Sequence, residues 1–439
     1  MRKGFLFDQN KCVNCNACSA ACILENNWKV HPRNIYTFNS EAEILLPLLN
    51  VSLACNHCES AVCMDGCPSS AYSREVITGA IIHDESKCIG CKYCQWNCPY
   101  DAPKFDSEKR TIAKCNLCYT GLIEGRLPAC SSACPTGALR FGQLSEPVPD
   151  RDYSWFPDRM LNPAFEFTSG NNYAPLKIIP EKMPCETDQK PVKEEKNFSG
   201  ELSLIIFSFL VTISVSTLIS SLIRGVLPEK MIIIPMLILA GLASFFHLGR
   251  KLRSWRSVAN MKNSPLSREV AAFVVFTFVT VVNTYLRFPS LLIASLVIGL
   301  FLLALIDGVY VYSDKSKSVI LHSGQTFLSA LLIGSFFSGI ILPFAFIALI
   351  KLTLSINSLK SSKILITYFG IRFLRIAFLI ISGLSLISKI SYNEHSVYFI
   401  FLTGELLDRI LFYIDFNPLN IKTLLEDRLK IERDEKKRC

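Results

Sequence analysis

The stretch KCIGCKYCQWNCPY at residues 87–100 contains Cys88, Cys91, Cys94 and Cys98, and Pro99 follows the last of them. This spacing is typical of loops that bind 4Fe-4S clusters. Three thiolates on a tight loop bind three irons of one cube, while the cysteine three residues further on binds a corner of the neighbouring cube. One such motif cannot complete a cluster, so partner motifs must lie elsewhere in the chain.

Three further cysteine motifs lie on either side of this stretch. They comprise Cys12, Cys15, Cys18 and Cys22; then Cys55, Cys58, Cys63 and Cys67, followed by Pro68; and last Cys115, Cys118, Cys130 and Cys134, followed by Pro135. Sixteen ligands in this pattern predict four 4Fe-4S clusters. Cys185 and Cys439 lie outside every motif, and we interpret both as bystanders.

Zinc and disulfide bonds are the alternative uses of so many cysteines. Zinc sites take thiolates in fours and do not call for a third cysteine followed by a fourth before proline. The N-terminus, MRKGFLFDQNKC, has no apolar segment of the length that a secretory signal needs. We therefore expect reduced cysteines that bind iron, and no disulfides.

The pairing of the motifs is partly readable from their spacing. The 20 residues between Cys67 and Cys88 include the strand-like run TGAIIHDESKC and match the gap in a bacterial two-cluster ferredoxin, which pairs the second motif with the third. The first and fourth motifs then remain as partners. The predicted ligand sets are Cys12, Cys15, Cys18 and Cys134; Cys22, Cys115, Cys118 and Cys130; Cys55, Cys58, Cys63 and Cys98; and Cys67, Cys88, Cys91 and Cys94. Strictly consecutive pairing of the motifs stays open.

Composition divides the chain into two parts that suit different solvents. The 439 residues are 50% hydrophobic and 19% charged, which excludes a disordered, collagen-like or small disulfide-stapled protein. The net charge of +9 resides in Lys and Arg beside hydrophobic spans, so membrane topology explains it better than nucleic-acid binding. We expect an α+β, ferredoxin-like four-cluster domain at 1–142, a Pro-rich extension and linker at 143–200, an all-α polytopic membrane bundle at 201–418 and a charged tail at 419–439.

The membrane part contains long apolar stretches of about 20 residues or more, the length a helix needs to cross a bilayer. We place seven spans, or eight if the fifth, which contains Pro343, is two elements rather than one kinked helix. Their predicted ranges are 202–223, 231–249, 269–287, 290–312, 324–351, 364–388 and 395–416.

One loop decides the expected orientation. Residues 250–268, RKLRSWRSVANMKNSPLSR, carry six basic residues and no acid, whereas the connections on either side are nearly uncharged. The loop should therefore be cytoplasmic. Two spans separate it from the cysteine domain, which places that domain on the cytoplasmic face of the inner membrane; the opposite face stays open.

His247 and Glu269 border this basic loop and are the candidate catalytic residues. Ionisable groups at membrane depth are costly and suggest function. If the site oxidises a quinol, which loses two protons with its two electrons, it needs a base, and histidine suits that role. The alternatives are a histidine that reaches the interface and a glutamate that only caps a helix after Ser267.

Other ionisable residues in the spans are better explained by pairing between helices, namely Asp307, Arg372, Arg375, Glu405, Asp408 and Arg409. A b-type haem needs two facing histidines. The membrane part has only His247, His322 and His395, each near the end of a span, so we expect no haem.

The phrases SLACNHCESAVCMDGCP, KCIGCKYCQWNCPYDAPKF and AKCNLCYTGLIEGRLPACSSACPTGALRFG make residues 3–180 resemble the four-cluster electron-transfer subunit of the dimethyl sulfoxide reductase family of molybdoenzymes. FFHLGRKLRSW, SPLSREV and GELLDRILFY resemble the membrane anchor subunit of the same enzymes. The chain looks like a fusion of the two subunits.

This resemblance implies a separate catalytic partner that carries molybdopterin guanine dinucleotide and receives electrons from menaquinol or a similar quinol. It implies that the cluster of Cys67, Cys88, Cys91 and Cys94 lies nearest the membrane, and that His247 and Glu269 lie near the quinol site. Related nitrate reductases have Trp and a 3Fe-4S cluster where this chain has Cys94, so four intact cubes are expected.

The sequence contains no phosphate-binding glycine loop, no nucleophile with its base and no second cofactor fingerprint. We therefore expect an electron-transfer and anchor subunit that is not an enzyme on its own. Alternatives are the same path run in reverse from a partner dehydrogenase to quinone, a transporter driven by the clusters, and a purely structural zinc-domain anchor. The absence of an internal repeat of the spans argues against the transporter.

Overall fold

The computed structural model describes residues 2–38, 49–144, 161–168, 201–313, 322–361, 369–388 and 394–416. These fall into two compact units, one containing the described residues up to 168 and the other those from 201 onward. Most of the predicted Pro-rich linker, the charged tail, Cys185 and Cys439 lie outside the described residues. Each unit is described by itself.

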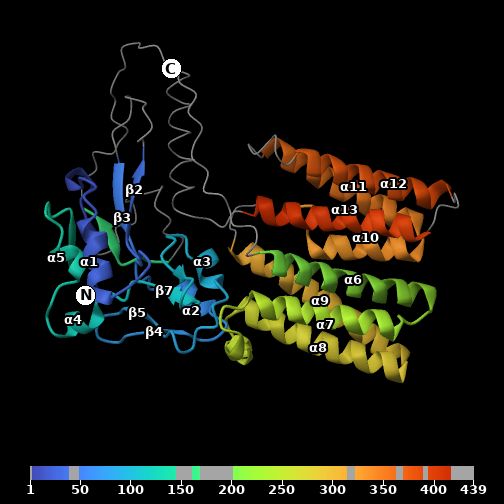
Figure 1. Cartoon of the computed structure of the whole chain (residues 1–439), viewed down its shortest axis with the longest axis horizontal. Coiled ribbons are helices and arrows are strands. Elements are labelled where there is room, and N and C mark those ends of the chain that lie inside the picture. Colours follow the sequence, from blue (N-terminus) through green and yellow to red (C-terminus); the bar gives the residue numbers. More distant parts are fainter. Residues whose placement is uncertain are drawn as a thin grey trace, which may run out of the picture. The chain divides into compact units, whose positions relative to one another are not determined.

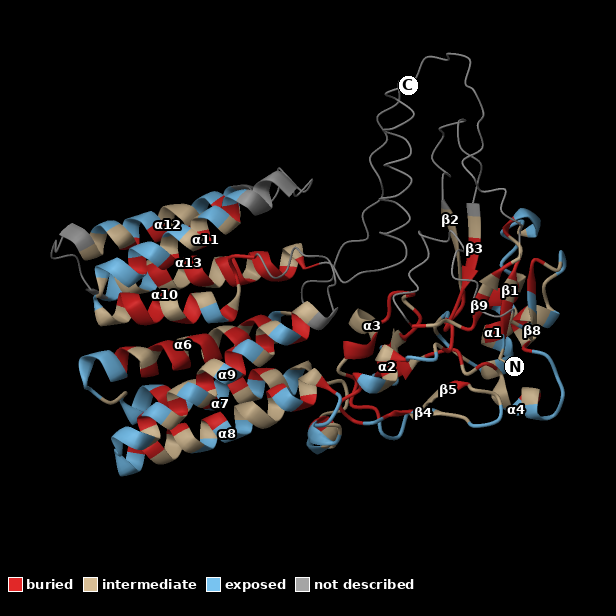
Figure 2. Ribbon diagram, turned by 180° about the vertical axis from the view of Figure 1, so that it is seen from behind, coloured by how far each residue is buried: buried red, intermediate tan, exposed pale blue. Residues whose placement is uncertain are grey.

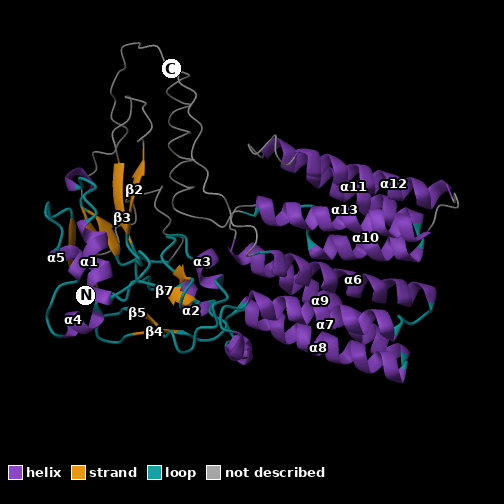
Figure 3. Cartoon of the chain, viewed as in Figure 1, coloured by secondary structure: helices purple, strands orange, loops and turns teal. Residues whose placement is uncertain are grey.

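The first unit is built from short helices and strands joined by many turns (Figures 1 and 3). In chain order they are β1 (Lys3–Phe7), the 3-10 helix η1 (Gln9–Lys11), α1 (Ala17–Asn26), β2 (Asn34–Phe38), β3 (Leu49–Leu53), α2 (Val62–Asp65), β4 (Tyr72–Arg74), β5 (Ile81–His83), α3 (Tyr93–Asn97), β6 (Lys104–Asp106), β7 (Thr111–Ala113), α4 (Tyr119–Ile123), α5 (Ala129–Ser132), β8 (Leu139–Gln143) and β9 (Phe165–Phe167).

Strand β1 is the centre of the only described sheet with more than two strands, whose order is β8-β1-β9. Its alternating sequence places Phe5 and Phe7 in the core, where Phe7 contacts Phe165 and Phe167 of β9. Gly4 is required here, because a Cβ at this position would lie 2.4 Å from the carbonyl oxygen of Ala164. The close approach lets β9 pair with β1 in parallel.

Strand pairing brings distant cysteine motifs together. β1 precedes the first motif and β8 follows the fourth, and their antiparallel register runs from Lys3 opposite Gln143 to Phe7 opposite Leu139. The hairpin β4–β5 lies between the second and third motifs. It contains the strand expected in TGAIIHDESKC, which is confirmed as β5. The backbone therefore links the first motif to the fourth and the second to the third.

The second unit contains helices that run side by side (Figure 1). They are α6 (Leu202–Arg224), α7 (Lys230–His247), the 3-10 helix η3 (Lys251–Val258), α8 (Pro265–Leu286), α9 (Pro289–Ser313), α10 (Thr326–Ser338), α11 (Ile341–Ser361), α12 (Phe369–Ser388) and α13 (Glu394–Asp415).

Apolar side chains lie on the outside of this unit as well as inside it. Among the described helices, α6, α7, α8 and the part of α9 up to Val311 are long and apolar enough to cross a membrane, while α10 and the apolar part of α11 are shorter. Phe246, Phe278 and Phe301 are among the exposed residues of these helices. Exposed positions recur along the helices of this unit in Figure 2. A surface this apolar suits a lipid environment rather than water.

The fifth predicted span is not a single kinked helix but two elements, the second of the two alternatives, because it forms the antiparallel pair α10 and α11. Gly339, with φ of 71°, ends α10, and its N–H and that of Ile340 bond back to the last turn of the helix. Pro343 lies in the first turn of α11, where a missing N–H is tolerated, so it begins a helix instead of kinking one. Contacts between Phe336 and Phe344, on either side of Gly339, confirm the reversal.

This hairpin determines at which end of the second unit the last described helix finishes. With seven spans, the end of the last helix would lie opposite the basic loop. With α10 and α11 antiparallel, the C-terminal end of α13 lies at the same end of the bundle as the basic loop and the N-terminus of α6 (Figure 1). The sequence that joins α9 to α10 includes Lys315 and Lys317, which agrees with the basic character of the loop at 250–268.

We predict that Gly334→Leu destabilises the bundle. A Cβ at Gly334 of α10 would lie 2.8 Å from Ile219 of α6, so a larger side chain must push the two helices apart. The expected loss is about 1–3 kcal/mol in the free energy of unfolding, measured by thermal unfolding of the full chain in detergent. Gly308→Leu on α9 is the control, since nothing lies within 4 Å of a Cβ there. Equal unfolding temperatures for the two variants would contradict this packing.

Candidate functional site

The sixteen motif cysteines form four groups of electrostatic neighbours in the first unit. The groups are Cys12 with Cys15, Cys18 and Cys134; Cys22 and Cys115 with Cys118 and Cys130; Cys58 with Cys55, Cys63 and Cys98; and Cys91 and Cys94 with Cys67 and Cys88. Each group combines three cysteines of one motif with one cysteine of another. The structure thus places cysteines of different motifs beside one another, with Cys18 also a neighbour of Cys22 and Cys130, and the four ligand sets stay predictions.

The groups also form a continuous series. Cys63 neighbours Cys67, so the third and fourth groups adjoin. Cys18 neighbours Cys22, which joins the first and second groups. Cys55 and Cys115 neighbour each other and connect the two halves. Three junctions therefore connect four cysteine groups in one row.

The fit of these groups to 4Fe-4S clusters can be tested on the structure. A cavity is lined by all four members of the first group, Cys12, Cys15, Cys18 and Cys134. All sixteen cysteines are free of disulfides. Within the described ranges, no three His, Cys, Asp or Glu side chains are placed to hold a single ion. A zinc ion would draw its thiolates to about 2.3 Å from one point. In a 4Fe-4S cube each thiolate binds a different iron, so the four sulfurs need not converge on one point. The residues present therefore fit a 4Fe-4S cluster better than a single zinc ion.

Left-handed residues shape the loops that carry the cysteines. His57 and Leu117 each lie two residues after the first cysteine of a motif and have φ of 43° and 65°. This curvature points their N–H groups at the sulfurs, and each donates to its cysteine, Cys55 or Cys115, at 3.4 Å. Backbone N–H groups aimed at sulfur favour its anionic form, which is the form that binds iron.

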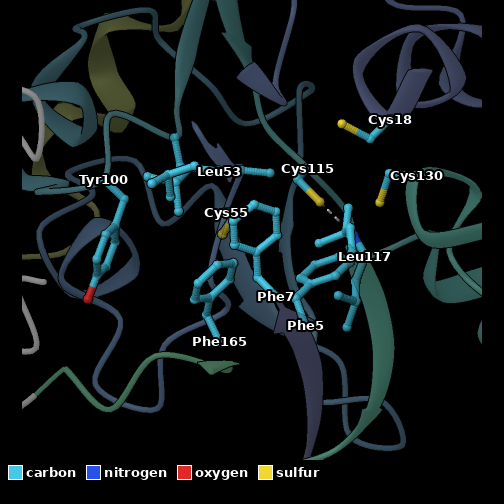
Figure 4. Packing of buried hydrophobic residues seen from close by; sticks show 14 of the residues in the cluster. Phe5, Phe7, Cys18, Leu53, Cys55, Tyr100, Cys115, Leu117, Cys130 and Phe165 are labelled. Carbon is cyan, nitrogen blue, oxygen red and sulfur yellow. Dashed lines mark hydrogen bonds between the residues drawn. The ribbon is translucent and has the colours of Figure 1, made fainter. Parts of the chain in front are cut away.

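Burial places several of these thiols in an apolar environment. Figure 4 shows Cys18, Cys55, Cys115 and Cys130 in the same hydrophobic core as Phe5. Burial raises the pKa of the Cys22 thiol to about 12, although Arg33 opposes the rise, and burial likewise raises the pKa of Cys98 to about 12. Thiols of this kind are protonated at neutral pH until a cation displaces the proton, so the arrangement favours metal binding over surface chemistry.

Two buried cations lie among the cysteine groups, and the sequence analysis missed both. Arg33 is 1% exposed, and its Nη1 donates to the carbonyl oxygen and hydroxyl of Ser52 at 3.3 and 3.2 Å. Its guanidinium also lies beside Cys130 and 4.5 Å from the centroid of the Phe5 ring. Lys114 is 3% exposed and contacts Cys55. The signal available for Lys114 was its position directly before Cys115; nothing local marks Arg33.

The membrane candidates His247 and Glu269 lie at the basic-loop end of the second unit. His247 is the last residue of α7 and is half-buried, while Glu269 is 8% exposed. The N-cap of α8 is Ser264, whose hydroxyl accepts from the N–H of Ser267. Glu269 therefore lies more than one turn inside the helix, which removes the interpretation that it caps the helix after Ser267.

Arg409 of α13 connects Glu269's surroundings to the start of α10. It donates to the hydroxyl of Ser208 and to the carbonyl oxygen of Gly324, each at 2.9 Å. Asp307 of α9 accepts from the N–H groups of Thr326 and Phe327 and so holds the buried N-terminus of α10. Arg409 and Asp307 are the charged neighbours of Glu269.

A second polar cluster lies between α10, α11, α12 and α13. Lys351 is fully buried, contacts Glu405, lies 2.9 Å from Asp408 and donates to the hydroxyl of Ser329 at 2.8 Å. Arg375 lies 3.2 Å from the same Asp408. The predicted pairing of Arg375, Glu405 and Asp408 between helices is thus confirmed, whereas Lys351 was missed. Its position inside an apolar run, FAFIALIKLTLS, was the available signal.

His322 has both ring nitrogens engaged. Nε2 lies 3.1 Å from Asp415, and Nδ1 accepts from the N–H of Gly324 at 2.9 Å. Asp415 also accepts from Arg372 at 2.7 Å. These contacts tie the start of α10 to the start of α12 and the end of α13, and they occupy the nitrogens that a haem would need.

Comparison with known proteins finds similarity in both halves. Residues 47–144 match the family model described as a 4Fe-4S dicluster domain, and residues 199–358 match that of the DMSO reductase anchor subunit (DmsC). The sequence is 36% identical to YnfG of Escherichia coli K12, a probable anaerobic dimethyl sulfoxide reductase subunit, over 33% of this chain and 74% of the relative. It is 36% identical to the B subunit of anaerobic dimethyl sulfoxide reductase of Haemophilus influenzae, over 33% and 75%. Protein NrfC of Escherichia coli K12 is 35% identical, over 34% and 68%.

We predict that Lys351→Met destabilises the chain by about 3–5 kcal/mol, because it leaves Glu405 without its cation in a buried site. The free energy of unfolding in detergent is the measurement. Lys262→Met, at an exposed lysine of the basic loop, should have little effect. The double variant Lys351→Met, Glu405→Met should recover most of the loss, since it removes both charges. A double variant less stable than Lys351→Met would contradict the pairing.

Proposed function

Because the chain belongs to the dimethyl sulfoxide reductase family, as a fusion of its iron–sulfur electron-transfer subunit and its membrane anchor subunit, we propose that it oxidises a membrane quinol and passes the electrons to a separate catalytic subunit. The chain is a multi-pass membrane protein that carries 4Fe-4S clusters. The observation that carries the proposal is the row of four cysteine groups. A row of redox sites in the first unit is suited to electron transfer, not to the conversion of a substrate.

The proposed ligand sets are the four groups given above. When bound, the clusters supply a series of one-electron carriers. The chain's own part is to hold each group of thiolates in a water-poor core and to keep neighbouring groups adjacent. Cys94 supplies the third thiolate of its motif, so the fourth group is complete and we propose four intact 4Fe-4S clusters.

We propose that His247 and Glu269 bind the quinol at the basic-loop end of the bundle. A quinol hydroxyl must lose its proton as the electrons leave, and an imidazole or carboxylate within hydrogen-bond reach accepts it. The burial of Glu269 and the charged side chains of Arg409 and Asp307 near it support this role, because a buried carboxylate gains from a hydrogen bond donated by an incoming hydroxyl. Occupied His322 nitrogens support direct transfer from quinol to the clusters without haem.

The partner we propose is a subunit that carries molybdopterin guanine dinucleotide, and the donor is menaquinol or a similar quinol. The names of the relatives, subunits of anaerobic dimethyl sulfoxide reductase, support this partner. We propose that the first unit faces the cytoplasm from the inner membrane. The chain enters α6 at the bundle end that carries the basic loop, and the positive-inside rule places that end in the cytoplasm.

Iron analysis and ligand variants test the clusters. We predict about sixteen irons per chain after anaerobic purification. Cys22→Ser and Cys118→Ser should alter the electron paramagnetic resonance signal of the same cluster, whereas Cys15→Ser alters another. Under consecutive pairing of motifs, Cys118→Ser would instead alter a cluster of the third and fourth motifs. Cys185→Ser is the control and should retain all iron. A signal pattern that groups Cys118 with Cys98, as consecutive pairing predicts, would contradict the proposed sets.

Variants of the membrane residues test the quinol site. We predict that His247→Ala and Glu269→Gln each slow cluster reduction by a quinol at least about 100-fold, because a general base contributes that much or more. Reduction by a soluble dye should not change, since the dye bypasses the membrane site. His395→Ala is the control. Unchanged quinol kinetics in either variant would remove that residue from the mechanism, and slower reduction by the dye would point to damaged clusters instead.

A further inference from the structure

Three of the four cysteine motifs begin with the same dipeptide, Lys-Cys. The local sequences are DQNKC at 8–12, DESKC at 84–88 and TIAKC at 111–115. In the first two, an aspartate precedes the lysine by three residues, while Thr111 takes that place in the third. The chain therefore contains its own comparison of one lysine position in three environments.

Lys11 and Lys87 are surface residues. Their side chains are 56% and 48% exposed, and each pairs with the aspartate of its own turn, Asp8 at 3.4 Å and Asp84 at 3.1 Å. Exposed pairs of this kind contribute little to stability and are screened by water and salt. Neither lysine is held against a sulfur atom by these contacts.

Lys114 is buried, and its ammonium group is fully used. Nζ donates to the carbonyl oxygens of Ile81 and Cys115 at 2.5 and 2.7 Å and to Cys55 Sγ at 3.3 Å. An ammonium has three N–H donors, and all three have acceptors. Among the residues that the structure describes, no carboxylate forms an ion pair with Lys114. A buried charge needs a counter-charge, and the groups near Lys114 that become anionic when they bind iron are the sulfurs of Cys55, Cys63 and Cys115.

The position of Lys114 along the row of cysteine groups is particular. The outer two junctions, between Cys18 and Cys22 and between Cys63 and Cys67, each lie within one motif. The central junction, between Cys55 and Cys115, is the one that joins different motifs. Lys114 contacts Cys55 with its side chain and Cys115 through the carbonyl oxygen, so the ammonium lies at this junction.

We propose that the Lys114 ammonium is a positioning charge that raises the midpoint potential of the cluster bound by Cys55, Cys58, Cys63 and Cys98. The inference rests on the proposed ligand sets and goes beyond them. One-electron reduction makes that site more negative by one charge, and the electron comes from the neighbouring site of the same chain. A fixed positive charge in a low-dielectric core favours the reduced form. The charge thereby favours electron transfer across the central junction, whose two cysteines, Cys55 and Cys115, belong to different motifs.

A purely structural role would have a different signature. By tying Ile81 of β5 to Cys115, Lys114 could act only as a clasp, and hydrogen-bond donors alone would then suffice. Lys114→Gln removes the charge but keeps two N–H donors, while Lys114→Arg keeps the charge. Lys11→Gln and Lys87→Gln are matched controls, since they make the same change in the same dipeptide at exposed positions.

The experiment measures iron content first and then the midpoint potentials of all four clusters in the purified full-length complex, by redox titration monitored with electron paramagnetic resonance. The signal altered by Cys58→Ser identifies the cluster in question. In Lys114→Gln we expect the equilibrium constant for reduction of this cluster to fall at least tenfold. For a one-electron step this lowers the midpoint potential by about 59 mV. Lys114→Arg should retain most of the wild-type potential, and the two controls should change nothing.

Each outcome decides the inference. Full iron content with an unchanged midpoint potential in Lys114→Gln would overturn the inference. Equal loss of the cluster in Lys114→Gln and Lys114→Arg would also overturn it, because the role of Lys114 would then be structural. Loss of that cluster in Lys114→Gln alone, with Lys114→Arg retaining it, would support the counter-charge. Wild-type protein without iron–sulfur signals would instead refute the proposed ligand sets.

Discussion

The pairing of β1 with β8 is the constraint on which the first unit depends. It holds the beginning of the first cysteine motif against the end of the fourth, although more than 100 residues separate Cys12 from Cys134. The hairpin β4–β5 does the same for the second and third motifs. Because each fourth cysteine completes a group in another motif, these two pairings determine which sulfurs can meet. Phe5 and Phe7 in β1 supply the apolar core that surrounds them.

The second unit depends on a different constraint. Its outer surface is apolar, so its charged side chains must pair with one another inside the bundle. Lys351, Arg375, Glu405 and Asp408 neutralise one another between helices, and Arg409 and Asp307 hold the buried start of α10. This start lies in the bundle because α10 has only 13 residues. The polar contacts of Arg409 and Asp307 are thus explained by the need to satisfy the buried start of the short helix α10. This explanation does not depend on a role in quinol chemistry.

Much of this was readable from the sequence, because cysteine spacing and hydrophobic length are direct consequences of cluster and bilayer geometry. The resemblance to the dimethyl sulfoxide reductase family is confirmed by the comparisons. The hairpin at Gly339 was not predicted as such, since apolar residues on both sides hide a reversal that depends on one left-handed glycine and a proline at a helix start. Arg33, Lys114 and Lys351 were missed because their partners are distant in sequence, and burial of a cation leaves no local periodicity.

The most direct test of the account is an anaerobic titration of the purified full-length chain with reduced quinol, in which the electrons accepted by the clusters are counted spectroscopically. The account predicts about four electrons per chain, one for each cluster, all supplied through the membrane site. Uptake of four electrons from a soluble dye but none from quinol would contradict the proposed connection between the two units. Uptake of fewer than four electrons from the soluble dye would contradict the row of four clusters itself.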